Sequence, residues 1–368
     1  MLRWVEVDLG SIGSNARYVR RTVGRNVKII AVVKADAYGH GAVPSGKAML
    51  KNGADMLAVA NIDEAEELRR GGIKAAVLIL NYTPHERFRE VLANRFSQTI
   101  FDLKSAKNLS LAARKAGRTA KVHIKVDTGM GRLGVMPEEA VCFARKIAEL
   151  PNIRIEGIFS HLSSAGDDRK YTKEQYKKFK DILDKLAGQG IRIPLIHISN
   201  SIATLAYPGM RLTAVRPGIM LYGNSPWGTK RKCAFLKPAM SLKARIVSLK
   251  EVCKGASISY GRTFRTKRRS LIAVIPVGYA QGYARNLSNR SSVIIRGKRV
   301  PVAGRICMDQ SLVDVTGISK IKVGDEVVLF GRQGREEIRA EELAGWYNTI
   351  GYEVVTTVGM LVPRIYIK

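Results

Sequence analysis

Residues 27–41 of the chain read VKIIAVVKADAYGHG. The run from Val27 to Val33 is short, apolar and rich in β-branched side chains, which is typical of a buried strand. It leads directly into Lys34 and a loop that contains glycine. A lysine in this place either extends its amine to solvent or lies in a partly desolvated site, where it can form a Schiff base. The stretch therefore predicts a buried strand with a candidate reactive lysine at its carboxyl end.

Similar runs alternate with helical stretches through the first two thirds of the chain, which is typical of βα units and a parallel sheet. One helical stretch, Asp63–Leu68, ends at Gly71, and another is expected to begin at Pro137. After a first strand at Val5–Leu9, the expected strands are Val27–Val33, Asp55–Val59, Ala75–Leu80, Ser97–Phe101, Lys121–Val126, Arg154–Phe159, Leu195–Ile198 and Thr213–Arg216. Eight such units predict an α/β fold, a (β/α)8 barrel over residues 1–232, with its chemistry at the carboxyl ends of the strands.

After about residue 232 the pattern changes to short alternating runs separated by glycines and turns, which predicts a mostly β C-terminal domain over residues 233–368. The linker is expected at Asn224–Gly228. Residues 1–10 are a candidate strand of this second domain. The expected strands of the domain are Ser241–Leu249, Leu271–Val277, Ser292–Arg296, Val300–Ala303 and Glu326–Phe330.

The composition is that of a globular protein, since 368 residues of which 46% are hydrophobic can bury sizeable cores. Four cysteines without a C-x-x-C pair favour reduced thiols over a disulfide framework or a zinc site, so no metal is expected. No run approaches the ~18 apolar residues of a membrane span, and the first residues do not resemble a secretory signal. A cytoplasmic protein without a membrane partner is therefore expected.

The net charge of the chain is strongly positive: 62 basic and 31 acidic residues give +31. Residues 228–269 hold thirteen lysines and arginines and a single acidic residue, Glu251. Such a charge attracts polyanions, so a cationic nucleic-acid-binding protein is an alternative of a different class. The basic residues are interleaved with strand-like runs and are not gathered on one helix or tail, which disfavours nucleic acid as a functional partner.

A second motif, KVDTGMGRLG at residues 125–134, contains the pattern G-x-G-x-x-G, with Glu156 near the spacing expected of a dinucleotide site. The next helix is expected only at Pro137, so these glycines do not open a helix and the dinucleotide interpretation is disfavoured. Other polar residues at expected strand ends are His161, Ser201 and Arg216. Each of them also has an ordinary structural explanation, such as a core histidine or a helix cap.

The stretch VVKADAYGHG closely resembles the cofactor-lysine segment of the alanine racemases, which depend on pyridoxal 5′-phosphate. The motif at residues 125–134 resembles the same family. Further family-like segments follow in the family's order at residues 215–223, 258–264, 277–283, 304–310 and 351–354, so that the resemblance covers essentially the whole chain. Two positions depart from it: Gln281 stands where the family usually has Asp, and Met360-Leu361 precede Val362-Pro363-Arg364 where an arginine is common.

The resemblance implies a homodimer with shared active sites and a two-base mechanism. Lys34 would bind the cofactor and act as one base, and Tyr260 of the partner subunit would be the other, with His161 as the neighbour that favours its phenolate. Arg216 would face the pyridine nitrogen of the cofactor. The implied cofactor-binding residues are Lys34, Tyr38, Ser201, Arg216, Gly218, Ile219 and Tyr352. The implied substrate-binding residues are Arg132 and Met308, and Lys125 is a candidate carbamylated lysine that orients Arg132.

The function that the resemblance implies is interconversion of L- and D-alanine, which supplies D-alanine for peptidoglycan. A racemase for serine or for a broader range of amino acids is the alternative within the same fold. Amino-acid decarboxylases share the two-domain architecture. A single barrel that only handles the cofactor is disfavoured by the second domain and its Tyr260.

Overall fold

The structure is a computed structural model that describes residues 1–231 and 233–368. It consists of two compact units. The barrel unit comprises residues 13–37 and 42–221, and the β unit comprises residues 1–12, 38–41 and 222–368. Residue 232, at which the sequence analysis ends the first domain, lies outside the described residues. Among the described residues no helix is long and apolar enough to cross a membrane.

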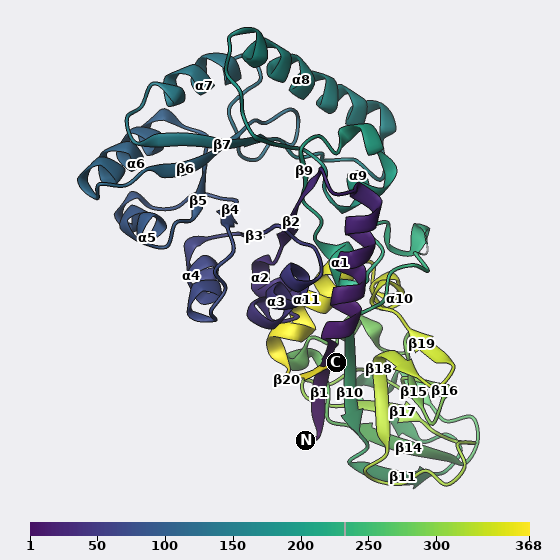
Figure 1. The fold of residues 1–368 in the computed structure, drawn as a ribbon. Helices are drawn as coiled ribbons and strands as arrows, with labels where there is room; N and C mark the ends of the chain where they lie inside the picture. Colours follow the sequence, from purple (N-terminus) through teal and green to yellow (C-terminus); the bar gives the residue numbers. More distant parts are fainter. Residues whose placement is uncertain (232) are drawn as a thin grey trace. The chain divides into compact units, whose positions relative to one another are not determined.

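The barrel unit is built on an eight-stranded parallel sheet in the order β8-β7-β6-β5-β4-β3-β2-β9 (Figure 1). The predicted (β/α)8 arrangement is therefore confirmed. The two strands at the ends of this order, β8 and β9, are also connected. The backbone N–H of Thr213, just before β9, donates to Ile196 O of β8 (3.2 Å), and the Ile196 N–H donates to the Thr213 hydroxyl (2.6 Å). The strands are β2 (Lys28–Val32), β3 (Met56–Val59), β4 (Val77–Ile79), β5 (Ser97–Ile100), β6 (Ala120–Lys125), β7 (Ile153–Phe159), β8 (Leu195–His197) and β9 (Ala214–Val215).

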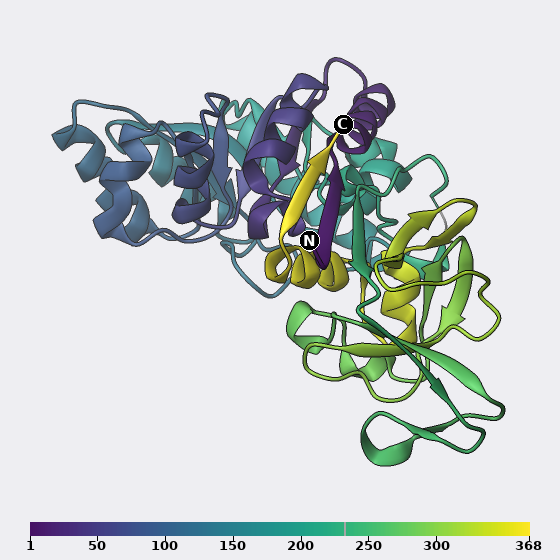
Figure 2. The same cartoon turned by 90° about the horizontal axis from the view of Figure 1, so that it is seen from below.

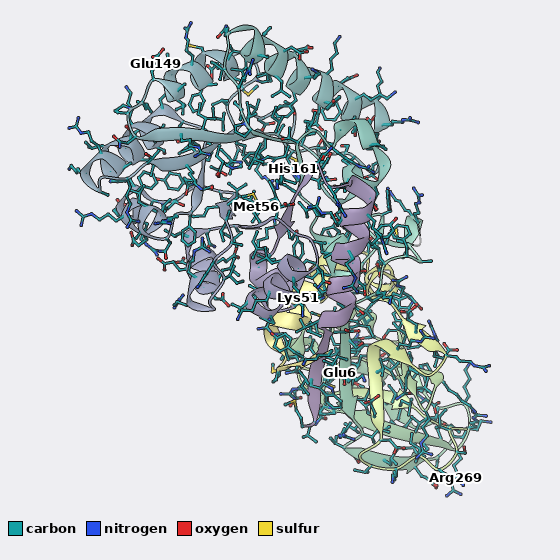
Figure 3. The ribbon with its side chains drawn as sticks, in the orientation of Figure 1. Glu6, Lys51, Met56, Glu149, His161 and Arg269 are labelled. Atoms are coloured by element: carbon teal, nitrogen blue, oxygen red, sulfur yellow. The ribbon has the colours of Figure 1, made fainter. Side chains whose placement is uncertain are left out.

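The strands read as continuous apolar runs because the sheet is covered. Strands β3, β4 and β5 are buried at every residue, as expected for a parallel sheet with helices on its outer face. In Figure 3, Met56 lies inside the ring of helices and Glu149 at its outer edge. The helices are α1 (Leu9–Val23), α2 (Lys34–Tyr38), α3 (Ala42–Lys51), α4 (Ile62–Arg70), α5 (Phe88–Ala93), α6 (Leu103–Lys115), α7 (Ala140–Ala148), α8 (Arg169–Gly188) and α9 (Ser201–Ala206), with 3-10 turns at His85–Arg87, Pro208–Met210 and Ile219–Tyr222.

Side-chain caps set several helix starts. Asn61, Asp102 and Asp168 accept hydrogen bonds from backbone N–H groups in the first turns of α4, α6 and α8. The prediction that a helix begins at Pro137 is wrong, because residues 137–139 form a turn and α7 begins at Ala140. No side chain caps this start.

The β unit contains a seven-stranded sheet in the order β16-β15-β18-β10-β1-β20, with β19 paired to β18, a three-stranded sheet β11-β14-β17 and the pair β12-β13. Strand β1 pairs antiparallel with β10 and parallel with β20, so both ends of the chain lie in one sheet (Figure 2). The strands are β1 (Arg3–Asp8), β10 (Met240–Arg245), β11 (Ser248–Val252), β12 (Ser257–Ile258), β13 (Phe264–Arg265), β14 (Ser270–Ile275), β15 (Ser292–Ile295), β16 (Lys298–Pro301), β17 (Ser311–Asp314), β18 (Glu326–Gln333), β19 (Glu336–Ile338) and β20 (Arg364–Ile367). Its helices are α10 (Ala340–Trp346) and α11 (Gly351–Leu361), with 3-10 turns at Gly228–Lys230, Tyr260–Arg262, Tyr279–Gln281 and Arg285–Leu287.

The single strand predicted at Ser241–Leu249 is wrong, because this segment forms two strands, β10 and β11, in different sheets. The change occurs at Ile246 and Val247, whose backbone N–H groups donate to Asp325 O (3.0 Å) and Val274 O (3.0 Å) respectively. Successive residues thus pair with different sheets. An alternating apolar pattern continues through such a corner and does not reveal it.

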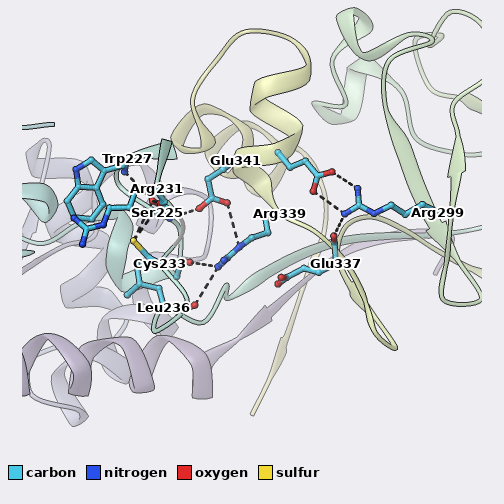
Figure 4. A network of polar contacts seen from close by, with 11 residues as sticks. Ser225, Trp227, Arg231, Cys233, Leu236, Arg299, Glu337, Arg339 and Glu341 are labelled. Atoms are coloured by element: carbon cyan, nitrogen blue, oxygen red, sulfur yellow. Dashed lines mark hydrogen bonds and ion pairs between the residues drawn. The ribbon is translucent and has the colours of Figure 1, made fainter. Parts of the chain in front are cut away.

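The segment predicted as a linker, residues 224–228, is held by polar contacts within the β unit (Figure 4). The backbone N–H of Ser225 donates to the Glu341 carboxylate, and the Ser225 hydroxyl donates to Arg231 O (2.6 Å). The guanidinium of Arg231 lies 4.8 Å from the ring centroid of Trp227, a cation–π distance. These contacts fix the segment as a part of the folded unit.

Candidate active site

A left-handed turn follows Lys34 directly. Residues Ala35, Asp36, Ala37 and Tyr38 have φ angles of 51°, 49°, 55° and 53°. None of them is glycine, and L-residues in this conformation cost roughly 1–2 kcal/mol each. Such strain persists only where surrounding contacts determine the backbone, and it concentrates at functional sites.

Three hydrogen bonds of the barrel unit hold this turn. The N–H of Ala37 donates to Val33 O (2.8 Å), and the N–H of Ala35 donates to Oε1 of Glu64 on α4 (2.8 Å). The carboxylate of Asp36 accepts from the N–H of Ala42 (2.6 Å). The turn therefore fixes the direction in which the chain leaves Lys34.

The amine of Lys34 forms no hydrogen bond or salt bridge within the described residues. Burial lowers the pKa of this amine, the positive charge of Arg132 lowers it further, and the carboxylate of Glu64 opposes the shift. A lowered pKa increases the fraction of neutral amine, which is the form that attacks a carbonyl carbon.

Lys125 ends β6, and its buried amine forms no hydrogen bond among the described residues. Its ammonium lies 5.6 Å from the ring centroid of Phe159. Burial, and then the charges of Arg132 and Arg216, lower the pKa of Lys125 to about 8. The carboxyl ends of the strands thus carry several cations near one another.

The motif at residues 125–134 forms a compact loop around Asp127. Its carboxylate accepts hydrogen bonds from the backbone N–H groups of Gly129 (2.9 Å), Met130 (2.7 Å) and Arg132 (2.8 Å). Since these glycines lie in a loop and α7 begins only at Ala140, they do not form the start of a helix that a dinucleotide site needs. The exposed side chain of Arg132 forms no hydrogen bond within the described chain.

Arg216 follows β9 and is 5% exposed. Its guanidinium lies 4.9 Å from the ring centroid of Phe159, and Nη2 donates to Ser160 O (2.7 Å). Nη2 also lies 3.3 Å from Nδ1 of His161, whereas Nη1 lies 2.5 Å from Nδ1 of His197. Because a guanidinium can only donate, both imidazole nitrogens must accept.

The ring of His161 is neutral at ordinary pH. Burial lowers its pKa first, and the charges of Arg216 and Arg132 bring the pKa to about 3. With Nδ1 accepting from Arg216, the single ring proton lies on Nε2. His161 can therefore donate one hydrogen bond through Nε2.

Ser201, Gly218 and Ile219 lie together at the ends of β8 and β9. The N–H of Gly218 donates to the hydroxyl of Ser201 (3.0 Å), and all three residues are buried. Asn200 caps α9 by accepting from the N–H of Ala203 (3.0 Å), so the Ser201 hydroxyl is not needed as the cap. It remains able to donate to a ligand.

The β unit carries the other predicted site residues. The rings of Tyr38 and Tyr352 lie with centroids 6.1 Å apart, and burial raises the pKa of Tyr352. Tyr260 and Met308 are 68% and 59% exposed. Gln281 is buried and accepts from the N–H of Gly278 (3.0 Å), so this side chain stabilises its own turn.

Several residues that position the site are not identified by the sequence analysis. Glu64 is interpreted there only as part of a helix, although its two oxygens accept from Ala35 and Ala60. On α8, the hydroxyl of Tyr171 donates to Gly129 O (2.8 Å), and Nε2 of Gln175 donates to His161 O (3.1 Å). Such contacts have no local signal, because their partners lie in the segments that follow other strands.

His123 is also missed, although a signal exists for it. It stands two residues before Lys125 on β6, and side chains two apart point to the same face of a strand. An inward-facing Lys125 therefore predicts an inward-facing His123. In the structure His123 is fully buried and lies 2.9 Å from the ring of His197.

Comparisons with known proteins agree with this architecture. The family model of the alanine racemase N-terminal domain matches residues 7–226, and that of the alanine racemase C-terminal domain matches residues 239–366. Alanine racemase 2 of Caldanaerobacter subterraneus subsp. tengcongensis is 48% identical over 365 residues, which are 99% of this chain and 94% of that protein. Alanine racemase of Methanococcus maripaludis is 46% identical over 367 residues, 99% of this chain and 98% of that protein.

Solved structures give the same result over the whole chain. Alanine racemase of Clostridium difficile 630 matches with a TM-score of 0.93 at 39% identity, covering 100% of this chain and 96% of that one. The alanine racemase of Bacillus anthracis with bound L-Ala-P matches with a TM-score of 0.91 at 38% identity, covering 100% and 95%. The chain belongs to the alanine racemase family.

Proposed function

We propose that this protein interconverts L- and D-alanine with pyridoxal 5′-phosphate bound to Lys34. The observation that carries the proposal is the group of cations around the unpaired amine of Lys34 at the carboxyl ends of the barrel strands. In a (β/α)8 barrel the chemistry is located at this end. The family membership of the chain supports the same reaction.

The residues present fit this cofactor. Arg132 and Arg216 bring two positive charges to the barrel mouth, and Asp127 directs its carboxylate at backbone N–H groups of its own loop. A cofactor phosphate and a substrate carboxylate are anions that these cations favour. The Ser201 hydroxyl beside the Gly218 amide supplies neutral polar groups of the kind that bind phosphate oxygens, with Tyr38, Ile219 and Tyr352 as further proposed contacts.

When bound, the cofactor supplies an electron sink that makes the α-proton of alanine removable. Lys34 would hold or release the proton on one face of the substrate at Nζ, for which a lowered pKa is favourable. Tyr260 of the partner subunit would act on the other face. A tyrosine with a pKa near ~10 is a weak base at neutral pH, so its phenolate needs a donor. Nε2 of His161 is the donor that we propose.

Arg216 would face the pyridine nitrogen. Burial lowers the pKa of Arg216 to about 9, so the guanidinium remains charged at neutral pH and can only donate. The ring nitrogen opposite it would then accept and stay unprotonated. Arg132 and Met308 of the partner subunit would contact the carboxylate side of the substrate.

We also propose that Lys125 is carbamylated. With a pKa of about 8, a fraction of its amine is neutral near pH 7. The neutral nitrogen forms a bond to the carbon of carbon dioxide, one C=O electron pair moves to oxygen, and the nitrogen loses a proton to water. The resulting anion would hold the guanidinium of Arg132 by charge-assisted hydrogen bonds.

The proposal also includes three properties of the whole protein: it would be a homodimer, it would be located in the cytoplasm, and it would supply D-alanine for peptidoglycan.

The experiment is an absorbance spectrum of the purified protein together with an assay for D-alanine formed from L-alanine. We expect the absorbance of a bound imine and a borohydride-trapped adduct on Lys34, both lost in Lys34→Ala. Lys47→Ala, which changes an exposed lysine of α3, is the matched control and should behave as the wild type. An adduct on another lysine, or no turnover of alanine by the cofactor-loaded protein, would refute the proposal.

The substrate preference is tested in the same assay. Tyr352 with the partner subunit's Tyr260 and Met308 would leave room for little more than a methyl group, so we expect alanine to be preferred. Such apolar surroundings discriminate weakly against one hydroxyl, so serine should react more slowly by about 10²-fold, and lysine and arginine should react poorly. Turnover of lysine or arginine at the rate of alanine would identify a broad-specificity racemase instead.

A further inference from the structure

A row of four polar side chains crosses the interior of the barrel unit and ends on Arg216. Nε2 of His123 lies 3.4 Å from Oε2 of Glu156, Nδ1 of His123 lies 2.9 Å from Nε2 of His197, and Nδ1 of His197 lies 2.5 Å from Nη1 of Arg216. Both histidines are fully buried. We call Glu156, His123, His197 and Arg216 the relay.

The hydrogens of the relay can be assigned from its arginine end. Arg216 only donates, so Nδ1 of His197 accepts and the proton of the neutral ring lies on Nε2. Nε2–H of His197 then donates to Nδ1 of His123, and the proton of His123 lies on its own Nε2. That nitrogen lies 3.4 Å from Oε2 of Glu156, which is an ion-pair distance without hydrogen-bond geometry, and it has no hydrogen-bond partner within the described residues. Every donor in the row points from Arg216 toward Glu156.

The carboxylate end favours the same direction. Burial by itself raises the pKa of Glu156, but the neighbouring His123, the hydrogen bond from Ser97 and the charge of Lys121 outweigh it and lower the pKa to about 2. An ionised carboxylate only accepts, so His123 must present N–H toward it. Burial and the charge of Arg216 lower the pKa values of both histidines, which agrees with neutral rings.

The sequence makes room for this row. A Cβ atom at Gly157 would lie 2.3 Å from Nδ1 of His123, so that only glycine at this position leaves space for the ring. On the other side, the ring of Phe159 stacks on His197 with centroids 4.9 Å apart and an interplanar angle of 10°. Because packing and hydrogen bonds both hold the rings, the relay is a rigid connection from β7 to the residue that follows β9.

We propose that Glu156 is a positioning residue, which acts through His123 and His197 to hold the guanidinium of Arg216 in one orientation. Glu156 does not touch Arg216 and is not a catalytic residue. The carboxylate favours one direction of the hydrogen bonds, and the relay supplies Nη1 of Arg216 with a side-chain acceptor in addition to the backbone carbonyl of His197. The effect on racemisation rests on the proposed function of Arg216, whereas the relay itself rests on the contacts above.

The informative substitution is Glu156→Gln. A glutamine amide can accept from His123, as the carboxylate does, but it can also donate. If it donates, the protons of both histidines move to Nδ1, and His197 then presents N–H toward the donors of Arg216. Two donors cannot form a hydrogen bond, so the side-chain contact of Nη1 is lost in that fraction of molecules. The bonds of Nη1 to His197 O (3.0 Å) and of Nη2 to Ser160 O (2.7 Å) remain, and they no longer fix the guanidinium as fully.

The first measurement is imidazole ¹⁵N NMR of the full-length protein labelled at histidine. The chain has five histidines, which is few enough for assignment by single substitutions. We expect His123 and His197 of the wild type to be neutral with the proton on Nε2, with and without added pyridoxal phosphate. In Glu156→Gln we expect a measurable fraction of both rings to be protonated on Nδ1. A charged or Nδ1-protonated His197 in the wild type would overturn the proposal, and this result needs no folded variant.

The second measurement is kinetic. We expect Glu156→Gln to lower kcat in proportion to the fraction of molecules whose rings NMR shows to be protonated on Nδ1, with little change in KM. Glu149→Gln, which changes an exposed carboxylate after α7, is the control and should leave both values unchanged. Wild-type kcat together with wild-type tautomers in Glu156→Gln would contradict the proposal. An alanine assay that fails in the wild type would contradict the proposed function, while the NMR result still tests the relay.

Discussion

Lys34 is placed by a backbone that its own sequence does not favour. Four successive residues without glycine, from Ala35 to Tyr38, occupy the left-handed region. The site therefore depends on contacts such as the one between Ala35 and Glu64, which compensate for strain. The sequence predicts the strand and the lysine after it, but not this turn, because propensity alone argues against it.

This strain can be tested at Ala35. Ala35→Gly removes the steric cost of a positive φ but makes the unfolded chain more flexible, so we expect a change of less than about 1 kcal/mol in the free energy of unfolding. Ala35→Val places a β-branched side chain at φ 51° and should destabilise by more than about 2 kcal/mol and weaken cofactor binding. Urea unfolding and cofactor titration measure both effects. A valine variant as stable as the glycine variant would contradict the argument.

Lys125 gives a second prediction for a single residue. Because only the neutral amine reacts with carbon dioxide and its pKa is about 8, carbamylation should increase as the pH rises from about 6 to 9. Intact mass measured in bicarbonate should show the added group, and Lys125→Ala should lack it and lose activity. A free amine at every pH, with full activity in Lys125→Ala, would indicate a lysine without this role.

At the scale of elements, α8 connects two loops of the site. Tyr171 reaches the loop of residues 125–134 through Gly129 O, and Gln175 holds the segment after β7 through His161 O and the N–H of Ser163. Amphipathic periodicity predicts that such a helix packs on the barrel. It does not predict which loops the polar side chains reach.

A matched pair of substitutions on α8 separates this role from general stability. The hydroxyl of Tyr171 donates a hydrogen bond to Gly129 O (2.8 Å), and the hydroxyl of Tyr176 donates one to Gly209 O (3.0 Å). Only Gly129 belongs to a loop of the site. Both Tyr→Phe variants should lose about 0.5–1.5 kcal/mol of stability. Only Tyr171→Phe should change kcat/KM for alanine, and equal kinetic effects in the two variants would count against the connection.

The element predictions succeed where burial is uniform and fail where the chain changes partner. The eight parallel strands are recognisable because each is a short apolar run between helical stretches, and the structure confirms them. The segment at Ser241–Leu249 remains alternating while it passes from one sheet to another, and α7 begins three residues later than Pro137 suggests. Pairing partners and caps of this kind depend on tertiary contacts, which a single segment of sequence does not contain.

At the scale of the whole molecule, three histidines that are neutral in the folded chain make the free energy of unfolding depend on pH. The pKa values of His123, His161 and His197 are lowered from 6.5, that of His161 to about 3. Below pH 6.5 the unfolded chain binds protons that the folded chain does not, so stability must fall as the pH falls, by up to about 1.4 kcal/mol per pH unit for each histidine. Urea titrations between pH 7 and pH 5 at one protein concentration measure this slope. His161→Gln should reduce it, and an unchanged slope would exclude His161 as a contributor.

The distribution of the proposed site over the two units leads to a prediction about assembly. Lys34 lies in the barrel unit, whereas Tyr260 and Met308 lie in the β unit with most of their surface exposed. Exposed side chains of this size are available to a second copy of the chain. If each site combines Lys34 of one subunit with Tyr260 of the other, a symmetric homodimer contains two such sites.

Mixed dimers test this arrangement directly. Dimers of Lys34→Ala and dimers of Tyr260→Phe should each lose activity by the ~10²–10⁴-fold that is typical of a removed acid or base. After mixed refolding, half of the dimers are heterodimers with one intact site, so about one quarter of the wild-type activity should return. The control mixes Lys34→Ala with the double variant Lys34→Ala, Tyr260→Phe, which cannot form an intact site and should remain inactive. Equal activity in the two mixtures, or a fully active monomer, would show that one chain carries the complete site by itself.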